Sequence, residues 1–243
     1  MNVLSVKGLC KEYPGFKLQD VSFEIAKGTI MGFVGRNGAG KSTTLKSLLN
    51  LVHTDAGSVE FFGLDLKLYE HDIKQRIGYT GGAVNFYKKK KIKNLIEITK
   101  TFYKKWDDET CEKYMKVFSL DANKTPSELS EGMKVKLSLV LALSYGAELL
   151  ILDEPTSGLD PVSRNELLEI FKHLKTKGIS ILFSTHIISD LEKCADEITY
   201  IRDGKIIYTG CISAFAGEHV SLENVMIQYE QEGLYEKFAD ERI

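Results

Sequence analysis

The sequence has few cysteines and few prolines, four of each among its 243 residues. The cysteines lie far apart and show none of the paired spacings that metal sites and disulfide scaffolds use. We interpret them as reduced structural thiols. They are Cys10, Cys111, Cys194 and Cys211.

The chain also lacks a long apolar run. Its most apolar window, residues 137–152, is interrupted by polar residues and falls short of the roughly 18 uninterrupted apolar residues of a membrane span. The first residues lack the basic segment and apolar run of a signal peptide. We therefore expect a cytoplasmic protein that reaches a membrane only through a partner.

The chain also has no large excess of positive or negative charge, because its 32 basic and 34 acidic residues give a net charge of -2. A nucleic-acid partner is therefore not expected, since such proteins carry a strong positive field. The hydrophobic content of 43% is enough for a core. The length allows one large domain or two small lobes.

Several apolar segments predict a parallel α/β sheet. Residues 28–34 are short, mostly apolar and bounded by glycine, which is typical of a buried strand. Residues 149–152 and 179–184 have the same character, and a helical pattern over about 163–177 separates them. A glycine-rich turn follows the first strand. A helical apolar stripe comes next, made of Leu45, Leu48, Leu49 and Val52.

Other regions differ from this core. The β pattern disappears between about residues 83 and 145, where segments 93–105 and 109–118 are predicted helices, so we expect an inserted helical lobe. Residues 198–208 form two β runs across an Asp-Gly pair and predict a hairpin. The tail is expected to form short helices.

Residues 35–42, Gly-Arg-Asn-Gly-Ala-Gly-Lys-Ser, fit the phosphate-loop pattern G-x-x-x-x-G-K-[ST]. The glycines let backbone N–H groups curl around phosphate oxygens. Lys41 would neutralise the terminal phosphates, and Ser42 would ligate magnesium. The helix N-terminus that follows adds partial positive charge. The alternative is an ordinary glycine-rich turn.

The apolar strand over residues 149–152 ends abruptly in Asp153 and Glu154. Two acids there are costly to desolvate unless a cation or a reaction occupies the site. We assign Asp153 to magnesium, held through its water shell, and Glu154 to polarising the attacking water. The alternative is that the acidic pair caps the next element.

Four further segments resemble those of the ATP-binding cassette (ABC) ATPases. Residues 129–133, Leu-Ser-Glu-Gly-Met, resemble the signature motif of that family, and residues 157–160, Ser-Gly-Leu-Asp, resemble its D-loop. His186 has the place of the switch histidine, and Tyr13 that of the aromatic residue stacked on adenine. The resemblance covers about residues 3–211.

This resemblance implies a P-loop NTPase fold with a mainly parallel sheet, an N-terminal antiparallel β subdomain and an inserted helical subdomain. It implies a single domain over residues 1–243, with an α/β core at about 1–82 and 146–211, a helical subdomain at about 83–145 and a tail at about 212–243. ATP and Mg²⁺ are the implied ligands. The implied catalytic residues are Glu154, His186 and Lys41, and the implied metal-binding residues are Ser42 and Asp153. The implied nucleotide-binding residues are Tyr13, Gly35, Asn37, Gly38, Gly40, Lys41, Ser42, Thr43, Ser130, Gly132 and Asp160.

Ser130 is a good N-cap for a helix, so the signature offers a second anion site. In the ABC family, ATP lies between the phosphate loop of one subunit and the signature of the other, in a head-to-tail dimer. Simpler roles remain open: Ser130 could only cap a helix, His186 could be a strand-end histidine, and Tyr13 or Phe16 could cover the core.

The sequence departs from the family at two places. Gly82 stands where the family has a glutamine that touches magnesium and the attacking water, so either water replaces that amide or hydrolysis is slower. Glu131 stands where glycine is commoner and brings a negative charge toward bound phosphate unless it turns to solvent.

A lysine run at 88–91, continued by Lys93, follows Phe86 and Tyr87. The run is either a solvated face or a surface near anionic lipid headgroups.

These features together predict the ATP-binding and ATP-hydrolysing subunit of an ABC transporter. It would power transport through a separately encoded membrane permease, and its resemblance to drug- and peptide-export subunits favours export. We expect an ATP-driven homodimer, or a heterodimer with another ABC subunit, on the inner face of the cell membrane. The alternative is a nucleotide-gated regulatory ABC module with weak ATPase activity.

Overall fold

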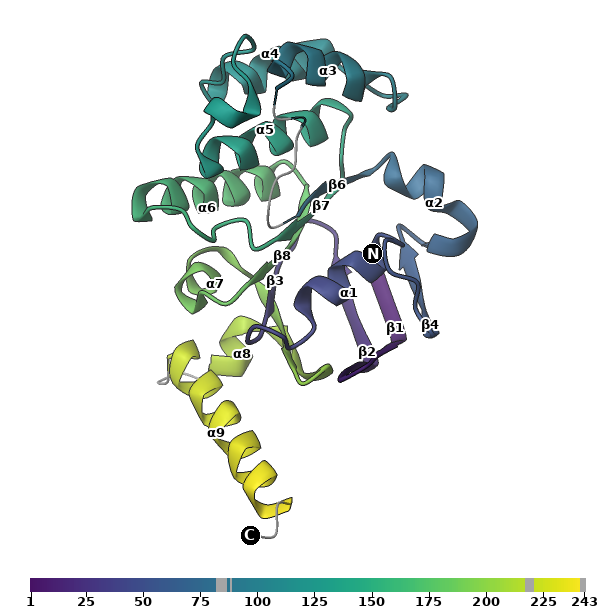
Figure 1. The fold of residues 1–243 in the computed structure, drawn as a ribbon, viewed down its shortest axis with the longest axis vertical. Helices are drawn as coiled ribbons and strands as arrows, with labels where there is room; N and C mark the ends of the chain where they lie inside the picture. The colour runs from purple at the N-terminus through teal and green to yellow at the C-terminus, as the bar shows by residue number, and fades with distance from the viewer. Residues whose placement is uncertain (82–86, 88, 217–220, 241–243) are drawn as a thin grey trace.

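The chain folds into two β-sheets with helices packed around them (Figure 1). The structure is a computed structural model that describes residues 1–81, 87, 89–216 and 221–240, the side chains of residues 216 and 232–240 excepted. The predicted P-loop fold class, with an antiparallel N-terminal sheet and a mainly parallel second sheet, is confirmed.

The larger sheet has six strands in the order β10-β9-β3-β8-β7-β6. All neighbours pair in parallel except β10, which runs antiparallel to β9 as the predicted hairpin requires. The strands are β3 (Ile30–Val34), β6 (Ile77–Thr80), β7 (Leu149–Asp153), β8 (Ser180–Thr185), β9 (Glu197–Arg202) and β10 (Lys205–Cys211).

The smaller sheet is antiparallel, with four strands in the order β2-β1-β4-β5. These strands are β1 (Asn2–Tyr13), β2 (Phe16–Ala26), β4 (Ala56–Phe61) and β5 (Leu64–Asp65). Helix α2 (Leu66–Lys74) leads from this sheet back to β6.

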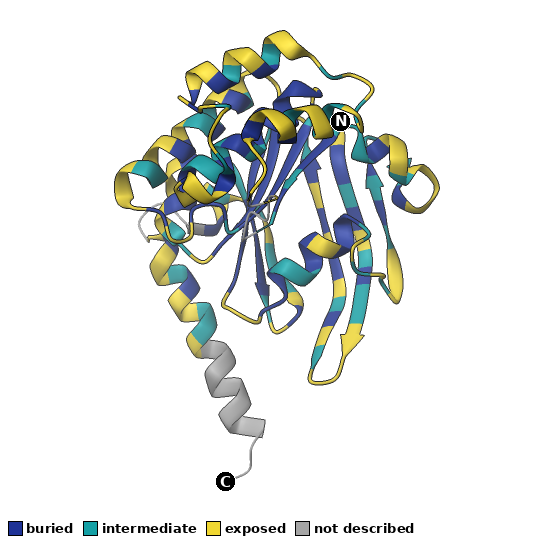
Figure 2. Ribbon diagram, turned by 45° about the horizontal axis from the view of Figure 1, so that its top comes forward, coloured by how far each residue is buried: buried dark blue, intermediate teal, exposed yellow. Residues whose placement is uncertain are grey.

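The central strands are buried on both faces because each separates two hydrophobic clusters. In β3, Ile30 and Val34 join the cluster formed with the large helices, whereas Met31 and Phe33 join the cluster shared with the smaller sheet. Successive strand side chains point to opposite faces, so this alternation explains the nearly continuous apolar sequence. Figure 2 shows these strands as the buried centre of the molecule.

Helix α1 (Lys41–Leu48) follows β3 after the glycine-rich loop and is shorter than the predicted stripe. Leu45 and Leu48 are fully buried as expected. Leu49 is the C-cap, and Asn50 then adopts a positive φ of 55° that turns the chain away. Val52 therefore lies outside the helix and is only half-buried.

The predicted helical lobe lies along the chain between β6 and β7. It consists of α3 (Ile92–Lys100), α4 (Asp108–Val117), the 3-10 turn η1 (Pro126–Glu128) and α5 (Glu131–Ser144). The first helix ends five residues earlier than the predicted 105. Beyond it, the Tyr103 ring stacks on Tyr145 with centroids 3.5 Å apart, which joins the segment after α3 to the end of α5. Whether these boundaries define a subdomain stays a prediction.

Helices α6 (Pro161–Thr176) and α7 (Ile188–Cys194) follow β7 and β8 respectively. The tail holds α8 (Ile212–Ala216) and α9 (Leu222–Asp240), so the expectation of short helices is wrong for α9, which has 19 residues. Leu222 and Met226 are buried, while the end of α9 projects from the body (Figure 1).

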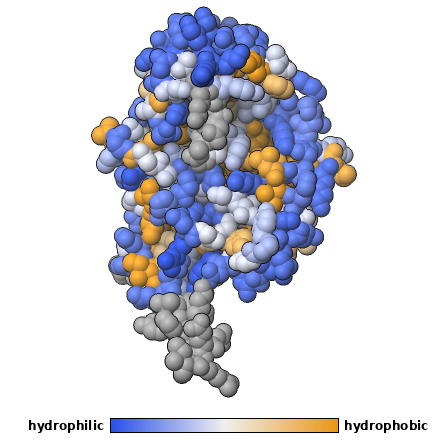
Figure 3. All heavy atoms as spheres, viewed as in Figure 1, coloured by the Kyte–Doolittle hydropathy of each residue, from blue (hydrophilic) through white to orange (hydrophobic). Residues whose placement is uncertain are grey.

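Apolar side chains on the face shown in Figure 3 form small separate patches, and the outer end of the α3–α4 region is hydrophilic. Within the described part of the chain, none of the helices combines the length and the apolar character needed to cross a bilayer.

Candidate nucleotide site

The glycine-rich loop between β3 and α1 depends on Gly40, which precedes the helix with a φ of 114°. A Cβ atom at this position would lie 2.7 Å from Leu18 Cδ2 and 2.9 Å from Phe16 Cζ. Only glycine fits both the backbone angle and this close approach to β2. The start of α1 is thereby fixed against the smaller sheet.

Lys41 is only 6% exposed, yet its ammonium group has three oxygen partners. Its Nζ atom donates to the carbonyl oxygens of Gly35, at 2.7 Å, and Arg36, at 3.3 Å. It also lies 3.3 Å from Glu154 Oε1. Because an ammonium has three donors, this set satisfies the buried charge. The lysine is therefore held at the floor of the loop.

Asp153 ends β7 and is buried beside two hydroxyl groups. Its Oδ1 atom accepts hydrogen bonds from Ser42 Oγ, at 3.1 Å, and Ser184 Oγ, at 2.6 Å. Burial, together with the charge of Asp153, raises the pKa of Tyr79 on the neighbouring strand. The structure thus joins the two residues that were predicted to bind magnesium.

Glu154 follows with a φ of 51°, outside the strand. Its backbone N–H donates to Ser184 Oγ at 2.9 Å, and its Oε2 atom lies 2.8 Å from His186 Nδ1. The left-handed backbone turns this side chain toward Lys41 and His186, whereas Asp153 faces Ser42. The two acids therefore have different partners, as expected.

These groups open onto a cleft of about 620 Å³. Eight of the predicted site residues line it: Asn37, Gly38, Gly40, Lys41, Ser42, Thr43, Glu154 and His186. The other lining residues are Gly15, Phe16, Arg36 and Ser157. Hydroxyl groups, a buried lysine and a glycine-rich helix start are suited to bind phosphate groups.

Six predicted residues do not line this cleft. Gly35 and Asp153 instead accept hydrogen bonds from Lys41 and Ser42, which do line it. Tyr13 is 39% exposed and pairs with Phe16 across the β1–β2 hairpin, and it is Phe16 that lines the cleft. The remaining three are Ser130, Gly132 and Asp160.

Ser130 and Asp160 both cap helices. Ser130 Oγ accepts from Met133 N at 3.3 Å at the start of α5, and the next residue, Glu131, forms an ion pair with Lys134 at 2.6 Å. Asp160 accepts from two backbone N–H groups of α6, and hydrogen bonding to Ser163 lowers the pKa of its carboxyl group. Glu131 is directed toward Lys134 and is more than half exposed.

The structure also contributes residues that sequence analysis did not select. Ser184 contacts both acids, and Arg36 and Phe16 line the cleft. A polar residue at the end of a buried strand was the available signal for Ser184. Arg36 occupies a variable position of the phosphate-loop pattern, so that pattern gave no signal for it.

Gly82, Phe86 and Lys88 lie outside the described residues, so the predictions that involve them stay predictions. The neighbouring Tyr87 is exposed, as are the described lysines of the basic run.

Comparisons with known proteins show which proteins the whole chain is similar to. A family model described as ABC transporter matches residues 18–157. The ABC transporter ATP-binding protein YtrB of Bacillus subtilis (strain 168) is 31% identical over 223 residues, which are 91% of this chain and 76% of the relative. The lantibiotic transport ATP-binding protein SrtF of Streptococcus pyogenes is 33% identical over 237 residues, 97% of this chain and 99% of the relative. A solved structure of an ATP-binding subunit of an ABC transporter aligns with a TM-score of 0.83 and 28% identity, covering 93% of this chain and 98% of that one.

Proposed function

The chain belongs to the ABC transporter family of ATP-binding proteins, and from that premise we propose that it hydrolyses ATP to power an exporter. One observation carries this proposal: the Glu154 carboxylate lies between Lys41 Nζ, at 3.3 Å, and His186 Nδ1, at 2.8 Å, in a phosphate-binding cleft. A carboxylate in this position can accept a proton from water that attacks the terminal phosphate.

The surrounding residues bind the phosphates and position Glu154. The loop backbone and Lys41 hold and neutralise the phosphates. His186 orients the Glu154 carboxylate, and the hydroxyl of Ser184 fixes the backbone that carries it. The Phe16 ring at the edge of the cleft is available to cover the base of the nucleotide.

Ser42 and Asp153 would hold Mg²⁺. Their oxygen atoms lie 3.1 Å apart, and hard oxygen donors are what Mg²⁺ prefers. Mg²⁺ usually takes one or two carboxylates together with substrate phosphates and water, which fits a site with a single buried carboxylate. When bound, the ion would neutralise charge on the phosphate oxygens.

The test is Glu154→Gln. The amide keeps the size of the side chain but cannot accept the proton, so Mg²⁺-dependent phosphate release should fall about 10²-fold or more while ATP binding survives. Glu112→Gln, at an exposed position of α4, is the matched control and should leave turnover unchanged. Undiminished turnover in Glu154→Gln would remove Glu154 as the base.

We further propose that ATP joins two chains head to tail, either two copies or one copy with another ABC subunit. The cleft lacks Ser130, Gly132 and Asp160, so a second chain is needed to bring a signature helix to the nucleotide. Light scattering of Glu154→Gln protein should show a dimer with ATP and a monomer without it. A monomer at saturating ATP would count against a homodimer.

The proposed membrane partner is a separately encoded permease, with this chain docked on its cytoplasmic side. Export is proposed from the similarity to a relative named for lantibiotic transport. Co-purification with membrane proteins encoded beside it, lost when those genes are deleted, is the expected result.

A nucleotide-gated module with weak turnover is the second candidate, and the sequence at Gly82 is what favours it. Gly82→Gln would supply the family's amide and should raise turnover by a modest factor, because a water molecule can make much of the same contact when the amide is absent. Full family-like turnover without that change would remove this candidate.

A further inference from the structure

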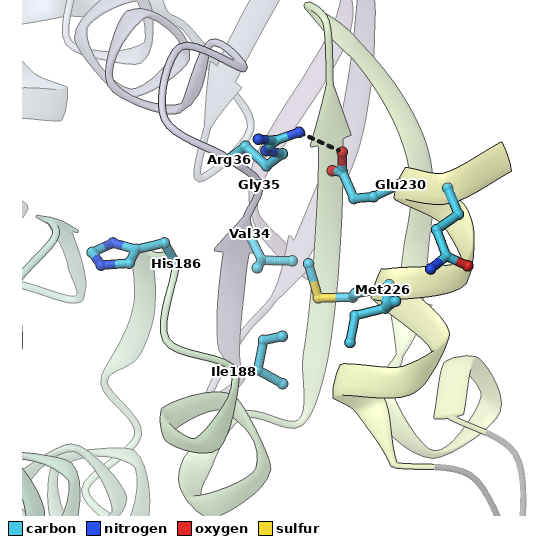
Figure 4. Close-up of a pocket in the computed structure, with 9 residues that line it drawn as sticks. Val34, Gly35, Arg36, His186, Ile188, Met226 and Glu230 are labelled. Carbon is cyan, nitrogen blue, oxygen red and sulfur yellow. Dashed lines mark ion pairs between the residues drawn. The ribbon is translucent and has the colours of Figure 1, made fainter. Parts of the chain in front are cut away.

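The C-terminal helix α9 reaches the phosphate loop through an ion pair. Glu230 Oε2 lies 3.6 Å from Arg36 Nη1, and Figure 4 shows the two side chains pointing toward each other. The Arg36 side chain is 79% exposed, whereas that of Glu230 is 24% exposed. The loop residue is thus the looser member of the pair.

Glu230 is also held in place by a contact with β9. Its Oε1 atom accepts a hydrogen bond of 2.6 Å from the hydroxyl of Tyr200 on β9, and burial together with this hydrogen bond raises the pKa of that hydroxyl. One residue earlier, the carbonyl oxygen of Tyr229 accepts from Arg202, and the Tyr229 ring stacks on Phe215. The carboxylate therefore keeps its place whether or not Arg36 stays beside it.

Packing does not fix Arg36 against α9. Between the loop and the helix lies a mainly apolar pocket of about 340 Å³, with Val34, Ile188 and Met226 facing into it (Figure 4). The ion pair spans the rim of this pocket. An exposed pair at this separation is weak, because water competes for both charges.

Arg36 also lines the nucleotide cleft. A triphosphate offers several negative oxygens, and the guanidinium group binds such oxygens in pairs, so nucleotide is a stronger competitor for Arg36 than one carboxylate. We propose that Arg36 is a nucleotide-binding residue whose guanidinium group Glu230 draws toward α9, so that α9 lowers the affinity for ATP. This inference rests on the proposed function of the cleft.

The probe is the non-hydrolysable triphosphate AMP-PNP, titrated into the full-length protein by calorimetry. Glu230→Gln removes the competing charge and should tighten binding about three- to fivefold, the range expected for an exposed ion pair. Arg36→Met keeps the length of the side chain without its charge and should weaken binding by about five- to tenfold. Glu223→Gln, the same change of charge in the first turn of α9, should leave the affinity as it is.

The decisive variant is the double substitution. If Glu230 acts only through Arg36, Glu230→Gln has no effect in the Arg36→Met background. An equal tightening in both backgrounds would overturn the proposal, because it would indicate a general field of the helix. An unchanged affinity in Glu230→Gln would overturn it as well. If the unaltered protein fails to bind AMP-PNP, the proposed function itself fails, which separates the two results.

Discussion

Helices α1 and α5 begin at the two segments that were predicted to bind phosphate, and they begin in opposite ways. The N-cap of α1 is Gly40, which has no side chain, and the first turn contains no acidic residue. The N-cap of α5 is Ser130, whose hydroxyl accepts from Met133 N, and Glu131 follows directly.

Because of this difference, the two helix starts offer different numbers of free N–H groups to an anion. At α1 no side chain occupies the first N–H groups, so they are free to serve a ligand. At α5 one N–H is already bonded and a carboxylate lies nearby. We infer that α1 binds phosphate within one chain, whereas α5 adds to a site that another chain has already formed.

Gly40→Ala should have the largest effect, because it places a side chain at the N-cap of α1. A Cβ atom at a φ of 114° and 2.7 Å from Leu18 imposes both backbone strain and overpacking, together about 2–5 kcal/mol of lost unfolding free energy. Urea unfolding measures this loss, and nucleotide titration should show that binding is lost with it.

Gly178→Ala is the matched control, because Gly178 has a φ of 82° but no heavy atom within 4 Å of the added Cβ. It should cost about 1–2 kcal/mol from the left-handed backbone alone. Equal losses of unfolding free energy at the two glycines would mean that Leu18 and Phe16 of β2 can move away from the added Cβ atom with little strain.

Ser130→Ala should have the next largest effect. Loss of the cap leaves Met133 N without its partner and should lower the unfolding free energy by about 1 kcal/mol. Ser130→Thr retains a hydroxyl and is the control. The ATP-driven dimer should weaken in the alanine variant, and a dimer of full affinity would show that the signature serine does not contact nucleotide.

Asp160→Asn tests how much the charge of the N-cap residue contributes at a third helix start, that of α6. Asparagine still caps a helix, but it cannot titrate. The pKa of Asp160 is held below its ordinary value of 3.8, so its charge stabilises the fold above that pH and the benefit is lost as the pH falls through the lowered value. The difference in Tm between the two proteins should be constant at neutral pH and close under acid conditions. A difference that persists in acid would contradict this.

Glu131→Gln should have the smallest effect. Its ion pair with Lys134 is exposed, and such pairs contribute about 0.2–0.5 kcal/mol. Removal of a negative charge at the start of α5 should tighten the ATP-driven dimer about two- to threefold. Glu169→Gln has the same spacing to Lys172 in the middle of α6 and should leave the dimer unchanged.

The sequence was sufficient for features that depend on neighbouring residues. Strands β3 and β7, predicted over residues 28–34 and 149–152, span Ile30–Val34 and Leu149–Asp153 and follow from burial on both faces, and the phosphate loop is one contiguous pattern. The end of α1 was missed because the apolar stripe continues to Val52 although Asn50 has already turned the chain. The length of α9 was missed because its apolar residues follow no single stripe.

Contacts between distant residues were beyond sequence reasoning. Ser184 on β8 contacts Asp153 on the neighbouring strand β7. Arg36 contacts Glu230, which lies almost at the other end of the chain. Neither pair has a local pattern, because the sheet order that brings its members together is set by packing of the complete core. The resemblance implied catalytic roles for Glu154 and His186, but neither their contact nor the left-handed backbone that directs Glu154 was predicted.

The position of β3 has a consequence for biosynthesis. This strand carries the phosphate loop, yet both of its neighbours come late, with Ile30 paired to Ile181 of β8 and Met31 to Glu197 of β9. At about 5–20 residues per second, a ribosome needs about 8–30 s to proceed from β3 to β8. During that interval five residues destined for complete burial have no sheet to join. An unpaired apolar strand is prone to aggregate during this interval, and a nucleotide can help to stabilise the fold only after β9 has been made.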